Sequence, residues 1–284
     1  MLVAYLLFSV VDTTSKSLLG LGYFAMQLAF LRYASQLVIT SLILMRQGAE
    51  VLRDAKPLLP QLVLRGSLLI CSTIFNFIAL KTMSLTVTSA IMFSAPVIVC
   101  ALSWPVLGER VGVVRWFAVA VGFLGVLIVI RPFGADLNPA AFLMVLAATG
   151  LALYSLMTRK LAGDVPALAL QFVLGLTGTI VLTPFAIAFW VPPETGVHFL
   201  LMVSLGFFAW MGHEFLIRAH RVAEANFLMP YSYSYLIYMS ISGYLFFDEV
   251  PDRWTIIGAC LIAASGLLIW RRELRVTRAR ESAS

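Results

Sequence analysis

Ten apolar segments, each about twenty residues long, take up most of this chain of 284 residues. A helix needs about 20 apolar residues to cross the roughly 30 Å hydrocarbon core of a bilayer, so segments of this length predict membrane-spanning helices. The short connections between them leave no room for an appended soluble domain. We expect the helices at 2–21, 24–45, 61–80, 84–107, 113–131, 138–159, 165–191, 197–219, 224–247 and 253–270.

The composition agrees with this interpretation. Hydrophobic residues make up 61% of the chain and charged residues only 12%, against about 25% charged residues in soluble domains. So few charges could not cover the surface of a soluble protein, and so much apolar surface excludes a disordered chain. The sequence therefore predicts an all-α integral membrane protein. The net charge of +6 is concentrated at the C-terminus and is typical of a cytoplasmic membrane flank, so we expect no nucleic-acid partner.

Lysine and arginine are distributed unevenly between the two sides of the predicted bundle. If both termini are cytoplasmic, fifteen of the 20 basic residues lie on that side, three lie outside, and Lys16 and Arg32 lie within spans. Cytoplasmic loops of membrane proteins carry an excess of these residues. We therefore expect a multi-pass protein of the bacterial inner membrane with cytoplasmic N- and C-termini.

An internal repeat is visible at an offset of 140 residues. Residues 79–131 parallel residues 219–271, and Glu109 corresponds to Glu249. Five helices per repeat is an odd number, so the second half enters the membrane from the opposite side, as in many transporters whose site lies between the halves. We expect a first five-helix repeat at 1–135, a second at 136–272, and a basic cytoplasmic tail at 273–284.

Residues 79–132, with a Leu-Gly-Glu-Arg turn at 107–110, resemble the repeat unit of the drug/metabolite transporter superfamily, and more narrowly the EamA-type exporters. The resemblance extends over essentially the whole chain. It implies ten helices in two inverted halves around a central cavity, and movement of small metabolites across the inner membrane. The second half departs from the pattern, with Phe-Asp-Glu-Val at 247–250. Because the ninth helix is rich in aromatic residues, the chain looks most like a bacterial aromatic amino-acid exporter.

Ionisable residues in the middle of a span cost roughly 2.5–3.5 kcal/mol each and are seldom without a role. Asp12 and Lys16 share one face of the first helix, and Arg32 lies at about the same depth on the second, roughly 15 Å from the membrane surface. These three side chains could form a structural cluster that locks the hairpin. Alternatively, Lys16 or Arg32 contacts a carboxylate of the substrate. Asn76 of the third helix is a further candidate, with interhelical packing as the alternative.

The ninth helix carries a polar aromatic stripe. Residues on one face of a 100° helical wheel are Tyr231, Tyr235, Tyr238 and Ser242. Buried phenols need hydrogen-bond partners, which a hydrated cavity supplies and lipid does not. We expect this stripe to line the substrate pathway opposite Trp210, with Tyr233 on the other side of the helix. Packing between helices is the alternative.

Four residues are candidates for gating or coupling rather than binding. Pro96 falls in the middle of the fourth helix, where it removes a backbone donor and could act as a hinge. Glu214 and Arg218 are four residues apart near the cytoplasmic end of the eighth helix, as in an ion pair. His213 lies beside Glu214 and is a weak candidate for a proton relay.

These patterns predict a secondary transporter, not an enzyme, that exports small metabolites by alternating access, with amino acids, aromatic ones included, as the expected substrates. Uptake or facilitated diffusion of a vitamin or sugar derivative is the first alternative. A membrane-embedded lipid enzyme is the second, but it would need a cluster of acid and base residues that the spans lack. The sequence has no phosphate-binding loop, and we expect no cofactor and no metal. The chain is expected to be a monomer or a homodimer.

Overall fold

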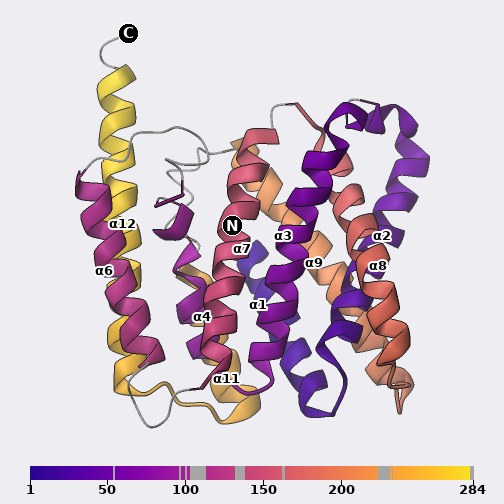
Figure 1. Cartoon of the computed structure of the whole chain (residues 1–284), viewed down its shortest axis with the longest axis horizontal. Coiled ribbons are helices and arrows are strands. Elements are labelled where there is room, and N and C mark those ends of the chain that lie inside the picture. Colours follow the sequence, from indigo (N-terminus) through magenta and orange to yellow (C-terminus); the bar gives the residue numbers. More distant parts are fainter. Residues whose placement is uncertain are drawn as a thin grey trace.

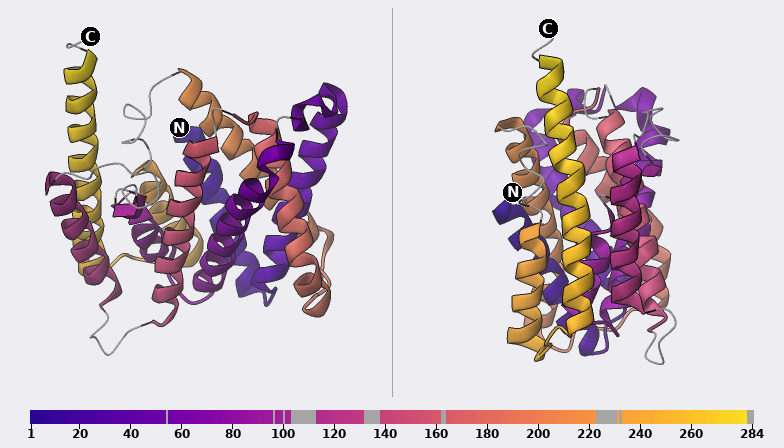
Figure 2. Two further views of the ribbon diagram at one scale, coloured as in Figure 1. Left: turned by 45° about the horizontal axis from the view of Figure 1, so that its top comes forward. Right: turned by 90° about the vertical axis from the view of Figure 1, so that its left-hand side faces the viewer.

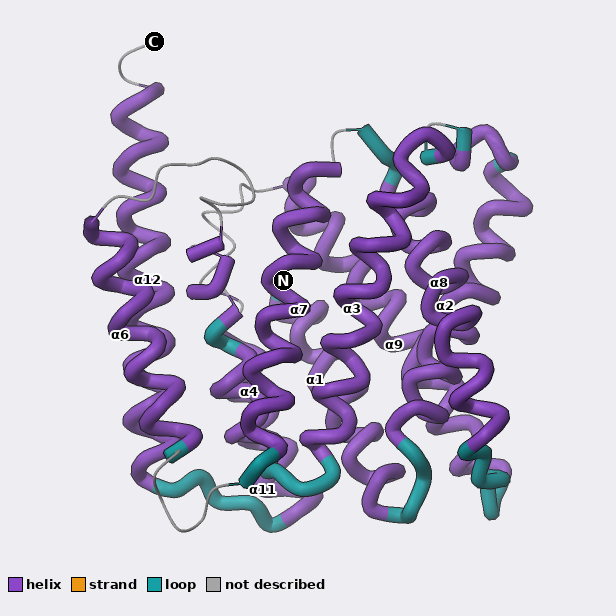
Figure 3. Tube along the Cα trace, in the orientation of Figure 1, coloured by secondary structure: helices purple, strands orange, loops and turns teal. Residues whose placement is uncertain are grey.

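The structure, a computed structural model, describes residues 1–53, 55–95, 97–99, 101–102, 113–131, 138–161, 164–222, 231 and 233–281. This part of the chain is all-α, with helices side by side along one axis, vertical in Figure 1, and joined by short loops (Figure 3). Ten α-helices lie within it: α1 (Leu2–Gly20), α2 (Ala25–Gln47), α3 (Leu59–Leu80), α4 (Leu85–Met92), α6 (Val113–Ile130), α7 (Ala140–Leu161), α8 (Ala167–Ala188), α9 (Gly196–Val222), α11 (Ser234–Phe247) and α12 (Arg253–Glu281). Two short 3-10 helices, Ala49–Leu52 and Lys56–Leu58, lie between α2 and α3.

Among the described residues, six segments are long and apolar enough to cross a membrane: α1, α2, α3 together with the preceding turn, α7, α8, and α9 as far as Leu216. Four shorter apolar helices accompany them, at Leu85–Val99, Trp116–Ile130, Ser234–Phe247 and Arg253–Leu268. The all-α membrane fold is thus confirmed, whereas the count of ten spans stays a prediction. Large apolar side chains cover the outside of the bundle, such as Ile187, which is 76% exposed, as lipid contact requires.

Most helices begin and end within a few residues of their predicted positions. Two predicted helices are exceptions. The helix predicted at 84–107 is interrupted, because α4 ends at Met92 and a turn follows, and residues 103–107 lie outside the described residues. The helix predicted at 224–247 begins later, because α11 starts at Ser234 and residues 223–230 lie outside the described residues. Helix α12 runs on to Glu281, so the helix continues into the predicted tail (Figure 1).

Local residues account for several of these helix boundaries. Gly22 and Gly48 adopt φ values of +94° and +90° in the turns that follow α1 and α2, a conformation that glycine takes without strain. Ser84 Oγ accepts a hydrogen bond from Val87 N at 3.2 Å and so caps the N-terminus of α4. The side chains of Asn138 and Asp252 accept backbone N–H groups in the same way at the start of α7 and α12.

The helices are arranged along the molecule in a definite order. At one side α2 packs against α8 and α9, at the other α6 packs against α12, and α1, α3, α4, α7 and α11 lie between them (Figures 1 and 2). The pair α6–α12 is held close by glycine. A Cβ atom on Gly125 would lie 2.8 Å from the carbonyl oxygen of Gly258, and one on Gly258 would lie 2.6 Å from that of Gly125. Such close backbone approach is the usual means of packing helices in lipid.

Helix ends define two ends of the bundle. At the basic end, α2 and α7 end with Arg46, Arg159 and Lys160, and α3 and α8 begin. At the opposite end, α1 and α11 end and α4 and α12 begin. The positive-inside rule predicts that the basic end faces the cytoplasm.

Candidate functional site

A carboxylate is buried in the middle of α1. Asp12 is 8% exposed, its Oδ1 accepts a hydrogen bond from Asn76 Nδ2 of α3 at 3.1 Å, and its Oδ2 accepts one from the Tyr235 hydroxyl of α11. Three of the predicted site residues therefore meet at one point, although they come from three different helices. Each carboxylate oxygen keeps further lone pairs, so the group can still accept a proton or an ammonium.

Arg32 of α2 is the second buried charge, also 8% exposed. Its Nη1 donates to Thr73 Oγ1 at 2.6 Å and to the Tyr33 hydroxyl at 3.4 Å. The Nε–H is buried without a hydrogen-bond partner among the described residues, and every bond of Arg32 in that part of the chain starts from Nη1. The Nε–Nη2 edge of the guanidinium is thus open. We call Asp12, Asn76, Tyr235, Arg32 and Thr73 the midplane cluster.

Lys16 does not join this cluster, which corrects the predicted association with Asp12 and Arg32. Its Nζ forms an ion pair with Glu249 and donates to the Met83 carbonyl at 2.5 Å. Glu249 Oε2 in turn accepts the backbone N–H of Leu85 at 2.7 Å, at the first residue of α4. The long lysine stem lets the ammonium reach toward the opposite end of the bundle, where it is less costly. We call Lys16, Glu249, Met83 and Leu85 the end cluster.

Arg65 of α3 is a buried charge, although it is one of the fifteen basic residues that the sequence predicts on the cytoplasmic side. It is 4% exposed and lies between α3, α7 and α8. Its Nε donates to Thr158 Oγ1 at 2.7 Å, its Nη2 to the Tyr154 hydroxyl at 2.7 Å, and its Nη1 to the Leu170 carbonyl at 3.4 Å. All three acceptors are neutral. The available signal was that Arg65 falls inside the apolar segment 61–80.

The predicted tyrosine stripe is only partly reproduced. The Tyr235 ring lies 6.3 Å from that of Tyr5 and 6.1 Å from that of Phe93, centroid to centroid. Tyr233 stacks on the same Phe93 ring at 5.2 Å, so its placement on the opposite side was wrong. The helical wheel fails there because α11 begins only at Ser234. Tyr231 also precedes the helix and is 39% exposed.

Tyr238 and Ser242 lie on α11 and are half-buried. The prediction that the stripe faces Trp210 is not reproduced. The Trp210 ring lies 6.4 Å from that of Phe207 on its own helix, and α1 packs against both α9 and α11. The central position of α1 was not evident from the order of helices in the sequence.

The predicted gating residues lie apart from the midplane cluster. Arg218 Nε bonds to Glu214 Oε1 at 2.9 Å, as the spacing predicts, with side chains 67% and 32% exposed. His213 packs its ring on that of Phe8 at 5.0 Å, on the interface between α9 and α1. Pro96 lies outside the described residues.

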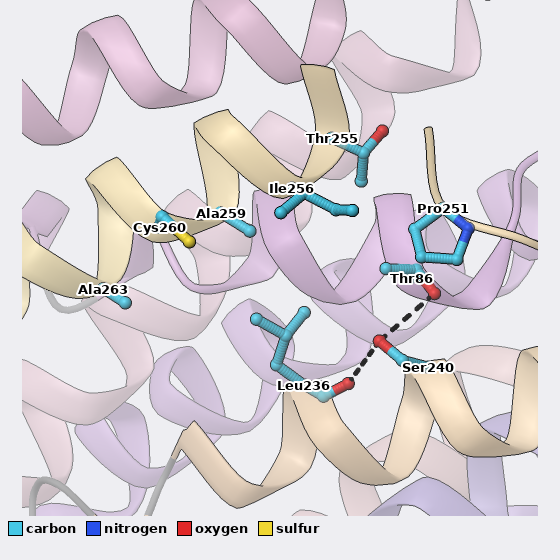
Figure 4. A pocket seen from close by; sticks show the side chains of 9 residues that line it. All are labelled: Thr86, Leu236, Ser240, Pro251, Thr255, Ile256, Ala259, Cys260 and Ala263. Atoms are coloured by element: carbon cyan, nitrogen blue, oxygen red, sulfur yellow. Dashed lines mark hydrogen bonds between the residues drawn. The ribbon is translucent and has the colours of Figure 1, made fainter. Parts of the chain in front are cut away.

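A pocket of about 190 Å³ lies between α4, α11 and α12 (Figure 4). Its wall is largely apolar, and Thr86 Oγ1 donates to Ser240 Oγ across it at 3.4 Å. Leu236 and Ser240 line it from the face of α11 that lies away from Tyr235 on the helical wheel. The pocket and the midplane cluster are therefore separate, and the charged groups identify the second as the candidate site.

Comparison with known proteins adds the family. The sequence profile of the EamA-like transporter family matches residues 1–131 and 138–271. The chain is 28% identical over 263 residues to the "S-adenosylmethionine uptake transporter" of Rickettsia prowazekii, covering 92% of this chain and 87% of the relative. It is 31% identical to the "Riboflavin transporter" of Vibrio cholerae, over 66% of this chain and 63% of the relative.

Two further matches complete this picture. The chain is 26% identical to the "Pseudopaline exporter CntI" of Pseudomonas aeruginosa, over 88% of this chain and 87% of the relative. One solved crystal structure is similar in fold, with a TM-score of 0.60 and 18% identity, over 95% of this chain and 98% of the other. None of the three named relatives is described as an aromatic amino-acid exporter. Because the family profile matches nearly the whole chain, this multi-pass membrane protein belongs to the EamA-like transporter family.

Proposed function

We propose that this protein is a secondary transporter that carries small metabolites with an amino-acid group across the bacterial inner membrane. The observation that carries this proposal is the open Nε–Nη2 edge of the buried Arg32. A carboxylate accepts two parallel hydrogen bonds from such an edge, and charge-assisted bonds of this kind are roughly twice as strong as neutral ones. In the membrane interior, a buried donor without a partner is costly, so a substrate carboxylate would remove that cost.

The balance of buried charge points the same way. Within the described residues, Lys16 and Glu249 neutralise each other, whereas two buried guanidiniums, Arg32 and Arg65, accompany the single buried carboxylate of Asp12. An anionic group on the substrate offsets the excess. The free lone pairs of Asp12 suit a substrate ammonium. A zwitterion with both groups therefore matches the midplane cluster.

The side chains around Tyr235 add a preference for a ring. Tyr5, Phe93 and Tyr235 form an aromatic group beside Asp12, and stacking on such rings is worth about 0.5–1.5 kcal/mol per pair beyond the buried area. S-adenosylmethionine, which one set of relatives takes up, combines an amino-acid group with an aromatic base. Phenylalanine and tryptophan, expected from the sequence, belong to the same class. We propose amino acids that carry an aromatic ring or base as substrates.

Alternating access between two inverted halves is the proposed mechanism. The helix contacts support it. If α7, α8, α9 and α11 are the counterparts of α1, α2, α3 and α4, each contact between the halves has an equivalent contact with the halves exchanged. The equivalent contacts are α1–α9 and α7–α3, α2–α9 and α8–α3, and α1–α11 and α7–α4. Inverted repeats of this kind rock around a site near the midplane. The end cluster ties α1, α4 and the segment after α11 together, and we propose that these contacts close the end away from the basic residues.

Export is the proposed direction, with uptake as the second candidate. The relatives named above include both an exporter and an uptake transporter. The uptake transporter matches 92% of this chain and the exporter 88%, so uptake stays the second candidate. Flux from each side of oriented vesicles separates the two directions.

The test is transport by purified protein in liposomes, with labelled S-adenosylmethionine, phenylalanine, tryptophan and riboflavin. Decarboxylated S-adenosylmethionine and phenethylamine serve as analogues without a carboxylate. We expect flux of at least one carboxylate member, and a fall of about tenfold or more in Arg32→Gln, since hydrogen bonds to a charged group are worth about 1.5–3 kcal/mol. The exposed Arg253→Gln is the matched control. Flux of riboflavin alone, or equal flux of acid and analogue, would contradict the proposal.

A further inference from the structure

We propose that Arg65 is a second binding site for the substrate carboxylate, occupied when the substrate enters or leaves at the basic end of the bundle. This inference rests on the proposed function and extends it from one anion site to two. Arg65 comes six residues after the start of α3, and so about 9 Å along the helix from that end. Its predicted location is therefore the cytoplasmic side of the path.

The hydrogen bonds of Arg65 leave it able to bind an anion. A guanidinium has five N–H donors, and three of them reach the neutral acceptors Thr158, Tyr154 and Leu170. One N–H on each terminal nitrogen thus remains free for a further acceptor, which suits the two oxygens of a carboxylate. The Tyr154 ring, 4.3 Å from the guanidinium carbon, holds the plane in place.

No acidic side chain compensates this charge within the described residues. Arg65 forms no ion pair there, in contrast to Lys16, Arg131 and Arg218. A buried charge without an opposite partner is strongly unfavourable. Interhelical ties in lipid are normally made by neutral Ser, Thr, Asn or Gln side chains at much smaller cost. A transient anion accounts for an arginine in this position, whereas a structural tie between α3 and α7 alone does not.

One face of α3 carries Arg65 together with two residues of the midplane cluster. Arg65, Thr73 and Asn76 fall within about 80° of one another on the helical wheel, over about 16 Å of helix. Leu69 lies between them on the same face. The Tyr33 hydroxyl bonds both to the Leu69 carbonyl at 3.3 Å and to Thr73 Oγ1 at 2.8 Å.

The experiment compares the two sides of oriented liposomes. In a background without the three native cysteines, Glu50→Cys in the loop between α2 and α3 allows capture of vesicles that expose the basic end. Half-saturation concentrations are measured from each side for phenylalanine with phenethylamine, and for S-adenosylmethionine with its decarboxylated form. We expect Arg65→Gln to raise the half-saturation concentration of the acid at least fivefold when transport starts from the basic end. The half-saturation concentration of the acid from the opposite end, and that of the analogue from either end, should change less than twofold. Arg32→Gln should raise the half-saturation concentration of the acid from both ends.

The outcomes separate this inference from the proposed function. Suppose that Arg32→Gln has the expected effect, but Arg65→Gln changes the half-saturation concentration equally from both ends, or equally for acid and analogue. Arg65 is then a structural residue, and the inference about Arg65 fails while the proposed function stands. If the parent protein moves none of the acids, both fail. Liposomes of phosphatidylcholine alone test a lipid headgroup as the anion: loss of the Arg65→Gln effect there would overturn the inference.

A second variant decides the question if Arg65→Gln does not accumulate. Arg65→Lys keeps the charge but loses the planar pair of donors. We expect its preference for acid over analogue at the basic end to fall about threefold, with an unchanged preference at the opposite end. A preference equal to that of the parent at both ends would contradict the inference.

Discussion

The midplane cluster and the end cluster both place charges inside the helix bundle, but they satisfy them in different ways. In the end cluster, Lys16 and Glu249 are in direct contact, and each has a further backbone partner. In the midplane cluster, Asp12 and Arg32 bind neutral side chains, and within the described residues they form no ion pair. Opposite charges are present in both, but among the described residues only the end cluster brings them into direct contact.

This difference separates structural from binding roles. Two opposite charges in direct contact neutralise each other and hold their helices together. A cluster that leaves donors and lone pairs open is less stable than it could be, as is common where function requires it. The midplane cluster is thus the better candidate for substrate, and the end cluster for closing one side.

The largest expected effect is that of Asp12→Asn. The amide can still bond to Tyr235, but it leaves Arg32 and Arg65 without a buried carboxylate in the described interior. We expect flux of amino-acid substrates in liposomes to fall about tenfold to a hundredfold, the range for a hydrogen bond to a charged group. Asp164→Asn, an exposed carboxyl near the basic end, is the control. Equal flux in parent and Asp12→Asn would remove the distinction between the two clusters.

Tyr235→Phe tests the midplane cluster one contact further out. It keeps the ring beside Tyr5 and Phe93 and removes only the bond to Asp12. We expect flux to fall about tenfold, because the lost bond is made to a charged group. Tyr244→Phe, at a side chain that is 62% exposed on the same helix, should change flux less than twofold. Similar losses in both variants would mean that phenols on α11 act through packing.

The sequence was sufficient to predict the class of fold and most helix positions, because hydrophobic length and periodicity are local properties. It also named Asp12, Asn76 and Tyr235, since a polar group within a span is conspicuous whatever its partners. Their meeting point was not predictable, because it depends on α1 lying between α9 and α11. Contacts of this kind follow from the order of helices in space, which periodicity does not contain.

The errors have the same origin. Lys16 was placed by the depth of its Cα atom, whereas its long side chain carries the charge several ångströms away to Glu249. Arg65 was counted with the cytoplasmic basic residues because it lies near a helix end, although α7 and α8 cover it. Tyr233 was placed by a helical wheel in a segment that precedes the helix. In each case tertiary contacts, not local pattern, decide where the polar atoms lie.

Glu249→Gln tests the end cluster and should have a smaller effect. The amide oxygen can still accept the hydrogen bond from Leu85 N, but the ion pair with Lys16 is lost. We expect the end opposite to the basic residues to open more often, so that a cysteine at Ser84 is modified about fivefold faster by a membrane-impermeant thiol reagent. This change corresponds to about 1 kcal/mol, the net contribution of a typical hydrogen bond. Glu194→Gln, exposed at the same end, is the control. An unchanged rate would show that the ion pair does not close this end.

The smallest effect is expected for charges in contact with water. Asp252 pairs with Arg131, caps α12 through Thr255 N at 2.8 Å, and has a side chain 44% exposed. Slight burial tends to raise the pKa of Asp252, but its hydrogen bonds from Thr255 and Arg131 outweigh this and lower the pKa below its ordinary value. Water screens the pair with Arg131, so most of the stabilisation comes from the cap, which is worth about 0.5–2 kcal/mol.

Because the folded-state pKa of Asp252 is lowered, its stabilisation is present above about pH 3.9, where the unfolded carboxyl titrates, and is lost as pH falls through the lower folded-state value. We expect Asp252→Ala, which removes both the charge and the cap, to lower the Tm of the detergent-solubilised protein by about 2–4 °C at pH 6, and the difference from the parent to shrink toward pH 3. Asp248→Asn, in the same loop, should leave the Tm unchanged. A decrease as large at pH 3 as at pH 6 would mean that the alanine lowers stability for a reason other than the lost carboxylate. Surface and buried charges would then not be distinguished by their response to pH.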